Sequence, residues 1–151
     1  MNKNLFLIVV FLLLGCESSL DRGPVLRYSG LSKPVSLREM RGGLNDYFGE
    51  RVLLYGVLSS THGLDLYPDD VSFKSLDTAS SVLIHVQNVE FCDAADGDWV
   101  LVYGWIVKSN PNYIHKYAAE IIGVEAVYRL SNEQLNDCRN GKPLDEVFSR
   151  R

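Results

Sequence analysis

Histidines, clustered aspartates and cysteines are the side chains of this sequence that could do metal or catalytic chemistry. His62, His85 and His115 lie too far apart in sequence for the close-set ligand pairs of zinc sites. The aspartates between residues 93 and 98 lack the alternate spacing and distant glutamate of an EF-hand loop, so we interpret them as turn residues. The sequence has no G-x-S-x-G motif for a nucleophilic serine. These patterns predict a protein that is not an enzyme and has no metal or cofactor.

Composition and charge exclude further classes. The sequence has 151 residues, a formal charge of −4 and 46% hydrophobic residues, which suits one folded domain and not a disordered chain. Binding of single-stranded nucleic acid requires a basic groove with stacking aromatic rings. Lys108 and Lys116 form only a small basic cluster in an acidic protein. We therefore expect no nucleic-acid partner.

The first residues have the pattern of an export signal. A short polar start with Lys3 precedes an unbroken apolar run over residues 5–14. As a helix this run would be about 15 Å long, whereas the hydrocarbon core of a bilayer is about 30 Å thick. The run is therefore too short to span a membrane and has the length of a signal-peptide hydrophobic region.

The end of this run, Leu13-Leu14-Gly15-Cys16, resembles the lipobox of bacterial lipoproteins. The resemblance implies a signal peptide over residues 1–15, cleavage before Cys16, and lipid on the Cys16 thiol, including palmitate-type acyl chains that anchor the protein in a bilayer. Residues 16–33 then form a flexible tether. An aspartate directly after the lipidated cysteine would signal retention in the inner membrane. This sequence has Glu17 at that position, and the absence of the aspartate favours the periplasmic side of the outer membrane. The alternative is an ordinary secretory signal that is cut after Ser18.

Two cysteines, Cys92 and Cys138, remain in the processed chain. An even remainder in an exported protein suggests one disulfide bond between them. Two unpaired buried thiols are the alternative, and the spacing of the two residues does not decide between them.

Two capping boxes predict helices near the two ends of the domain. Ser36 with Glu39 predicts a short helix that begins near Leu37, and Ser131 with Gln134 predicts a helix that runs to about Arg139. Between them, segments rich in Val, Ile, Leu and Tyr predict strands over residues 51–59, 64–67, 81–86, 99–108 and 118–128. Turn-forming residues separate these segments.

Two of the predicted strands share one sequence pattern. Residues 49–58 and 97–106 both read Gly, acid, any residue, Val-Leu, aliphatic, Tyr-Gly, any residue, aliphatic. The second glycines of the two copies, Gly56 and Gly104, lie inside the strands, where glycine usually marks a bulge or a bend. Two long strands that bend in mid-course are what a small closed barrel requires.

This set of elements resembles the OB-fold over residues 34–128. The resemblance implies a mainly β domain over residues 34–151, with a five-stranded OB-like barrel, a short leading helix and a C-terminal helix. The sequence is also similar to uncharacterised exported OB-like proteins from bacteria. Another small β-barrel and an α+β sandwich with the same strands remain as alternatives.

The OB-fold resemblance implies where ligands would bind. OB-folds bind with the loops after their first and fourth strands, here residues 59–63, with His62, and residues 108–116, with Lys108, Tyr113 and His115. Strand alternation also places Tyr103 and Trp105 on the outer face of a strand. That face is either an exposed aromatic patch for a partner or is covered by one of the predicted helices.

We expect from these patterns a lipid-anchored, non-catalytic protein of the bacterial cell envelope. Its OB-like domain would bind another envelope protein through a barrel face or the loops. A small-molecule or saccharide binder is the alternative, and an enzyme comes third.

Overall fold

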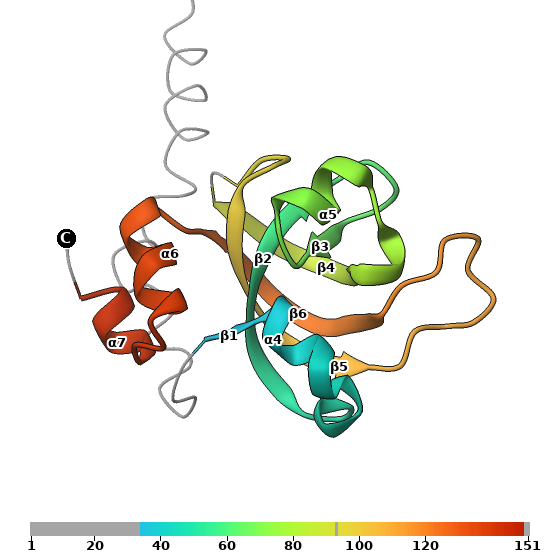
Figure 1. Ribbon diagram of the computed structural model, residues 1–151, viewed down its shortest axis with the longest axis horizontal. Coiled ribbons are helices and arrows are strands. Elements are labelled where there is room, and N and C mark those ends of the chain that lie inside the picture. Colours follow the sequence, from blue (N-terminus) through green and yellow to red (C-terminus); the bar gives the residue numbers. More distant parts are fainter. Residues whose placement is uncertain (1–33, 93, 150–151) are drawn as a thin grey trace, which may run out of the picture.

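The computed structural model describes residues 34–92 and 94–149 (Figure 1). The predicted signal peptide, the tether and Cys16 lie outside the described residues. Within the described part of the chain, no helix has the length and apolarity needed to cross a membrane.

A closed barrel forms the centre of the molecule. Its strands are β2 (Arg51–Ser59), β3 (Asp65–Tyr67), β4 (Val82–Cys92), β5 (Trp99–Val107) and β6 (Ala119–Arg129). They pair in the order β2-β3-β4-β6-β5, and β5 pairs back onto β2 to close the barrel. The pair β4 and β6 is parallel, and the other pairs are antiparallel. The predicted mainly β, OB-like barrel is therefore confirmed.

Strand β4 is longer than the sequence pattern predicts. The apolar run ends at Val86, but the strand continues to Cys92 beside β6, with register shifts on both sides of Val86. Pairing with a long neighbour extends this strand beyond its own apolar pattern, because tertiary pairing can override local preference.

The two copies of the repeated pattern pair with each other about a local two-fold axis. Leu54 and Val102 occupy the same place in the pattern, and they are also direct partners across β2 and β5. The first glycines of the copies have the same positive φ of 87°. Gly49 N donates to Ile106 O at 2.8 Å, and Gly97 N donates to Leu58 O at 2.9 Å. The repeat therefore makes the same turn at both ends of the β2–β5 pair.

The second glycines of the repeat permit close approach of neighbouring strands. A Cβ at Gly56 would lie 2.4 Å from the carbonyl oxygen of Tyr67 on β3. A Cβ at Gly104 would lie 2.7 Å from Ile121 Cγ1 and 2.8 Å from the carbonyl oxygen of Ile122 on β6. Close approach of neighbouring strands is therefore what these two positions require, and at Gly104 it coincides with a register irregularity between Val102 and Trp105. The predicted bend at Gly56 stays a prediction.

A leading segment packs against the barrel interior. Strand β1 (Val35–Ser36) pairs parallel with β2 and leads into α4 (Leu37–Met40) and η1 (Arg41–Tyr47). Both members of the predicted capping box make their bonds: Glu39 N donates to Ser36 Oγ at 3.0 Å, and Ser36 N donates to Glu39 Oε2 at 3.4 Å. Leu37 and Met40 are fully buried in the cluster that fills the barrel.

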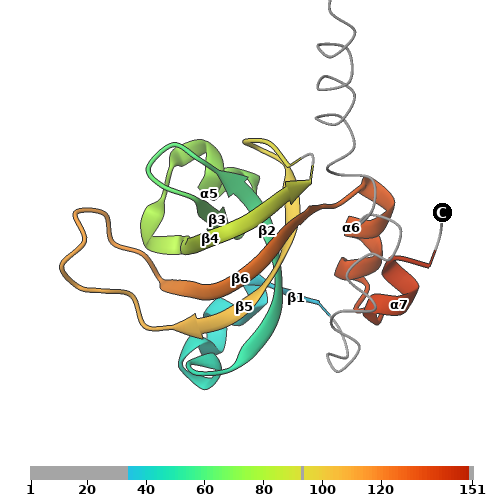
Figure 2. The ribbon, with the colours of Figure 1, turned by 180° about the vertical axis from the view of Figure 1, so that it is seen from behind.

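The C-terminal helices cover the outer face of β2 and β5 (Figures 1 and 2). Helix α6 (Asn132–Arg139) begins with the predicted capping box at Ser131, and α7 (Leu144–Val147) follows it. Leu135, Leu144 and Val147 pack with Tyr55 and Tyr103 in a second apolar cluster. Of the two possibilities for this aromatic face, the helix cover is therefore the one observed for these two tyrosines.

Two short helices in the β3–β4 connection complete the described chain. They are α5 (Asp70–Ser75) and η2 (Thr78–Ser80). Asp69, which the sequence pattern marks as a turn residue, caps α5 by accepting a hydrogen bond from Ser72 N at 2.8 Å. On the side of the molecule away from α6 and α7, the β5–β6 loop projects from the barrel (Figures 1 and 2).

Candidate functional site

The two loops predicted to bind a ligand meet at the end of the barrel. The His62 ring of the β2–β3 loop lies 4.4 Å from the His115 ring of the β5–β6 loop, measured between centroids, with an angle of 44° between their planes. We call this surface the rim and define it by residues 60–64 and 108–118. The sequence predicted that His62 and His115 lie in the two ligand-binding loops, and the structure brings their rings into contact.

Internal bonds hold the β5–β6 loop in shape. Lys116 Nζ donates to Pro111 O at 2.6 Å, and the Tyr113 and Tyr117 rings meet edge to face with centroids 6.1 Å apart. At the tip of this braced loop, Ile114 has 95% of its surface exposed. The loop therefore displays one large apolar side chain that the protein itself does not cover.

Glu120 fastens the base of the same loop to the barrel. It is the second residue of β6, is 7% exposed, and accepts a hydrogen bond from Asn110 N at 2.5 Å. Its other carboxylate oxygen lies 2.5 Å from His85 Nε2 on β4. The His85 side chain is 38% exposed, so it contacts this carboxylate while it also reaches solvent.

A buried carboxyl group lies next to the rim. Asp65 is the first residue of β3 and is fully buried, and neither of its carboxylate oxygens has a hydrogen-bond partner among the described residues. Burial raises the pKa of Asp65 from 3.8 to about 6, and nearby His62 opposes this rise. The sequence pattern places Asp65 in the predicted strand over residues 64–67, and nothing local in the sequence reveals that its side chain points inward.

These groups do not assemble into a metal centre. Across the described ranges 34–92 and 94–149, no group of three or more His, Cys, Asp or Glu side chains has the arrangement needed to hold a metal ion. The rim therefore offers aromatic, apolar and single polar contacts to a partner.

Three further predicted binding residues are Lys108, at the start of the β5–β6 loop, and Trp105 and Tyr103 on β5. Lys108 is exposed, and its Nζ lies 5.8 Å from the centroid of the Phe48 ring. Trp105 is 40% exposed, and the guanidinium of Arg51 lies 4.7 Å from its ring centroid. Tyr103 is only 7% exposed because α6 and α7 cover it. Contact of Tyr103 with a partner stays a prediction, and the helix cover leaves little of this side chain exposed for it.

No disulfide is seen among the residues whose side chains the structure describes. Cys138 is a free, buried thiol in α6, and burial raises its pKa to about 12 with a further contribution from the charge of Asp137. The Cys92 side chain lies outside what the structure describes. Pairing of the two cysteines therefore stays a prediction.

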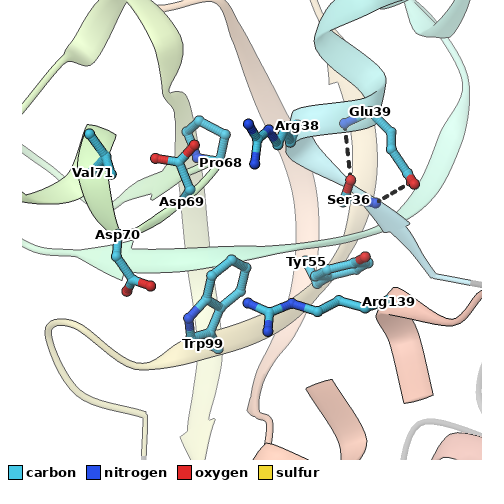
Figure 3. Close-up of a pocket in the computed structure, with 10 residues that line it drawn as sticks. All are labelled: Ser36, Arg38, Glu39, Tyr55, Pro68, Asp69, Asp70, Val71, Trp99 and Arg139. Atoms are coloured by element: carbon cyan, nitrogen blue, oxygen red, sulfur yellow. Dashed lines mark hydrogen bonds between the residues drawn. The ribbon is translucent and has the colours of Figure 1, made fainter. Parts of the chain in front are cut away.

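The structure also contains a pocket that was not predicted from the sequence. A pocket of about 520 Å³ lies where α4, α6, the start of α5 and the outer faces of β2 and β5 come together (Figure 3). Its lining residues are Ser36, Arg38, Glu39, Tyr55, Pro68, Asp69, Asp70, Val71, Trp99 and Arg139. These residues come from segments far apart in the sequence and share no motif, so only the fold brings them together.

Comparisons with known proteins add no relative. The sequence matches no protein-family model, and neither the curated proteins nor the solved structures contain a match to it.

Proposed function

We propose that this protein is a lipid-anchored component of the bacterial envelope that binds another envelope protein at the rim, without catalysis. The observation that carries the proposal is the 95% exposure of Ile114 at the tip of a loop that is braced from several sides. A large apolar side chain held out in this way gains free energy when a partner covers it. Bracing also lowers the entropy that the loop loses on binding.

The rim is a better candidate than the barrel face. Tyr103 is already covered by the protein's own helices, which leaves Trp105 as the open aromatic ring of the predicted patch. At the rim, His115 and Lys116 directly follow Ile114 on the same loop. A partner that suits this surface has an apolar hollow bordered by acidic groups.

The lipobox-like residues at positions 13–16 support the anchor. Lipid on Cys16 would hold the domain at the membrane surface, with the processed chain on the periplasmic side of the outer membrane. In this setting the partner is an envelope protein rather than a cytoplasmic one.

In-cell photo-crosslinking tests the partner. The full chain would carry a photoreactive amino acid at Ile114 or, as the control, at Asp145, which is exposed on α7. We expect a discrete protein adduct from position 114 and not from position 145. Equal adducts at both positions, lipid adducts alone, or no adduct from folded and membrane-attached protein would overturn a protein partner at the rim.

Cell fractionation tests the anchor separately. The Cys16→Ser variant lacks the thiol that would be lipidated, so we expect it to leave the membrane fraction. If this variant stays in the membrane to the same extent as the unchanged protein, the lipid anchor is wrong.

A further inference from the structure

The unpredicted pocket contains two guanidinium groups that lie beyond ion-pair distance of the carboxylates among the described residues. Arg38 extends from α4 and Arg139 from the last turn of α6, and both line the pocket (Figure 3). Among the described residues, neither forms an ion pair within 4.0 Å of a carboxylate. Unpaired arginines in a hollow are suited to a carboxylate, because the guanidinium fork matches its two oxygens.

Arg139 is held in place before any ligand arrives. Its guanidinium lies 4.9 Å from the centroid of the Trp99 ring, a cation–π contact. In Figure 3 it lies beside the Trp99 ring and below the Tyr55 ring, and both rings line the pocket. An arginine that is fixed by stacking loses little side-chain entropy when it binds an anion.

Three acidic residues line the pocket. Two of them accept helix-capping hydrogen bonds, and the third makes no such bond. Glu39 is engaged in the cap of α4 and Asp69 in the cap of α5. The cap bonds from Ser72 lower the pKa of Asp69, and the nearby positive charge of Arg38 lowers it further. Asp70 is exposed and makes no hydrogen bond or ion pair with other described residues. In Figure 3 the Asp70 carboxylate is on the other side of Trp99 from Arg139. The pocket thus offers free groups of both signs on two sides of an aromatic ring.

We infer that this pocket binds a small zwitterion, an α-amino acid or a dipeptide, with its carboxylate on Arg38 and Arg139 and its ammonium group on Asp70. A pocket of about 520 Å³ is large enough for such a molecule. Three carboxylates around two guanidiniums disfavour polyanions such as phosphorylated ligands, because the carboxylates repel the additional negative charge. This site is separate from the rim and does not depend on the function proposed there.

Thermal unfolding and calorimetry of the purified full chain test the inference. The probes are the standard α-amino acids and alanylalanine at millimolar concentration, with N-acetyl-alanylalanine and alanylalanine amide as blocked controls. We expect at least one unblocked probe to raise the Tm, and we expect the amide to lose most of this effect because it lacks the carboxylate. No shift from any unblocked probe, or an equal shift from the amide, would overturn the inference.

Substitutions then locate the site. Arg38→Gln and Arg139→Gln should each weaken the Kd about tenfold, the loss expected for a charge-assisted hydrogen bond. Asp70→Asn should weaken unblocked alanylalanine and leave the binding of the acetylated form unchanged. Arg41→Gln removes the same charge from an exposed residue outside the pocket and should change nothing. Because Arg139 stacks on Trp99, its variant is compared with Arg38→Gln, and unchanged binding in both would place the ligand elsewhere.

Discussion

At the scale of single residues, Asp65 is a buried ionisable group whose protonation affects the stability of the fold. Its carboxyl group is fully buried without a partner, and burial raises its pKa to about 6. The folded protein therefore holds a proton on Asp65 more tightly than the unfolded chain does. It follows that the contribution of Asp65 to stability is largest below about pH 4 and is lost as the pH rises through about 6.

The Asp65→Asn variant tests this dependence, because its amide cannot ionise. Relative to the unchanged protein, we expect the variant to gain free energy of unfolding between about pH 4 and about pH 7. Urea denaturation at both pH values measures the two free energies. A difference between variant and unchanged protein that is the same at both values would show that folding does not raise the pKa of Asp65.

The sequence predicts the rim residues better than it predicts the buried or dispersed ones. His62 and His115 are identified because they lie in loops that the OB-like strand order brings together. Asp65 belongs to a short strand whose inward face has no local pattern. Arg38 and Arg139 lie in two helices that meet only through the barrel, and this meeting depends on contacts distant in sequence.

At the scale of elements, the C-terminal helices α6 and α7 cover the barrel, and α6 also contributes Arg139 to the pocket. Helix α6 was predictable because its capping box at Ser131 is a local signal. The short helices α5 and α7 were not, because four to six residues carry too little periodicity to distinguish a helix from a turn. The cover of Tyr103 was one of two possibilities until the packing of α6 was known.

Leu135 on α6 provides the test of this cover. It is 6% exposed in the cluster with Tyr55 and Tyr103, so Leu135→Ala should lower the free energy of unfolding by about 2–5 kcal/mol. Asn136→Ala, on the exposed side of the same helix, is the control and should have a small effect. Chemical denaturation measures both. Similar losses in the two variants would mean that α6 does not stabilise the barrel through this face.

At the scale of the whole molecule, barrel closure depends on two glycines in equivalent places of the repeated pattern. The sequence predicted both Gly56 and Gly104, because glycine inside an apolar strand is costly unless geometry requires it. The full length of β4 was not predictable in the same way, since its second half is set by pairing with β6.

Gly104→Ala should destabilise the barrel by about 1–3 kcal/mol or more, because the new methyl group would lie 2.8 Å from a backbone oxygen that cannot rotate away. Gly42→Ala is the matched control, since a Cβ there would have no atom within 4 Å. Thermal unfolding compares the two. If the Gly104 variant melts with the control, close strand approach is not what this glycine provides.

The local two-fold relation between β2 and β5 also bears on assembly. Residues 49–58 and 97–106 share one residue pattern, and the two segments pair with each other as β2 and β5. A strand with this pattern from a second chain could therefore pair with β2 or with β5. At high concentration, pairing within one chain competes with exchange of these strands between chains. A lipid anchor would bring the chains together on one surface and favour this exchange. In such an exchange, residues 49–58 of one chain would take the place of residues 97–106 of another.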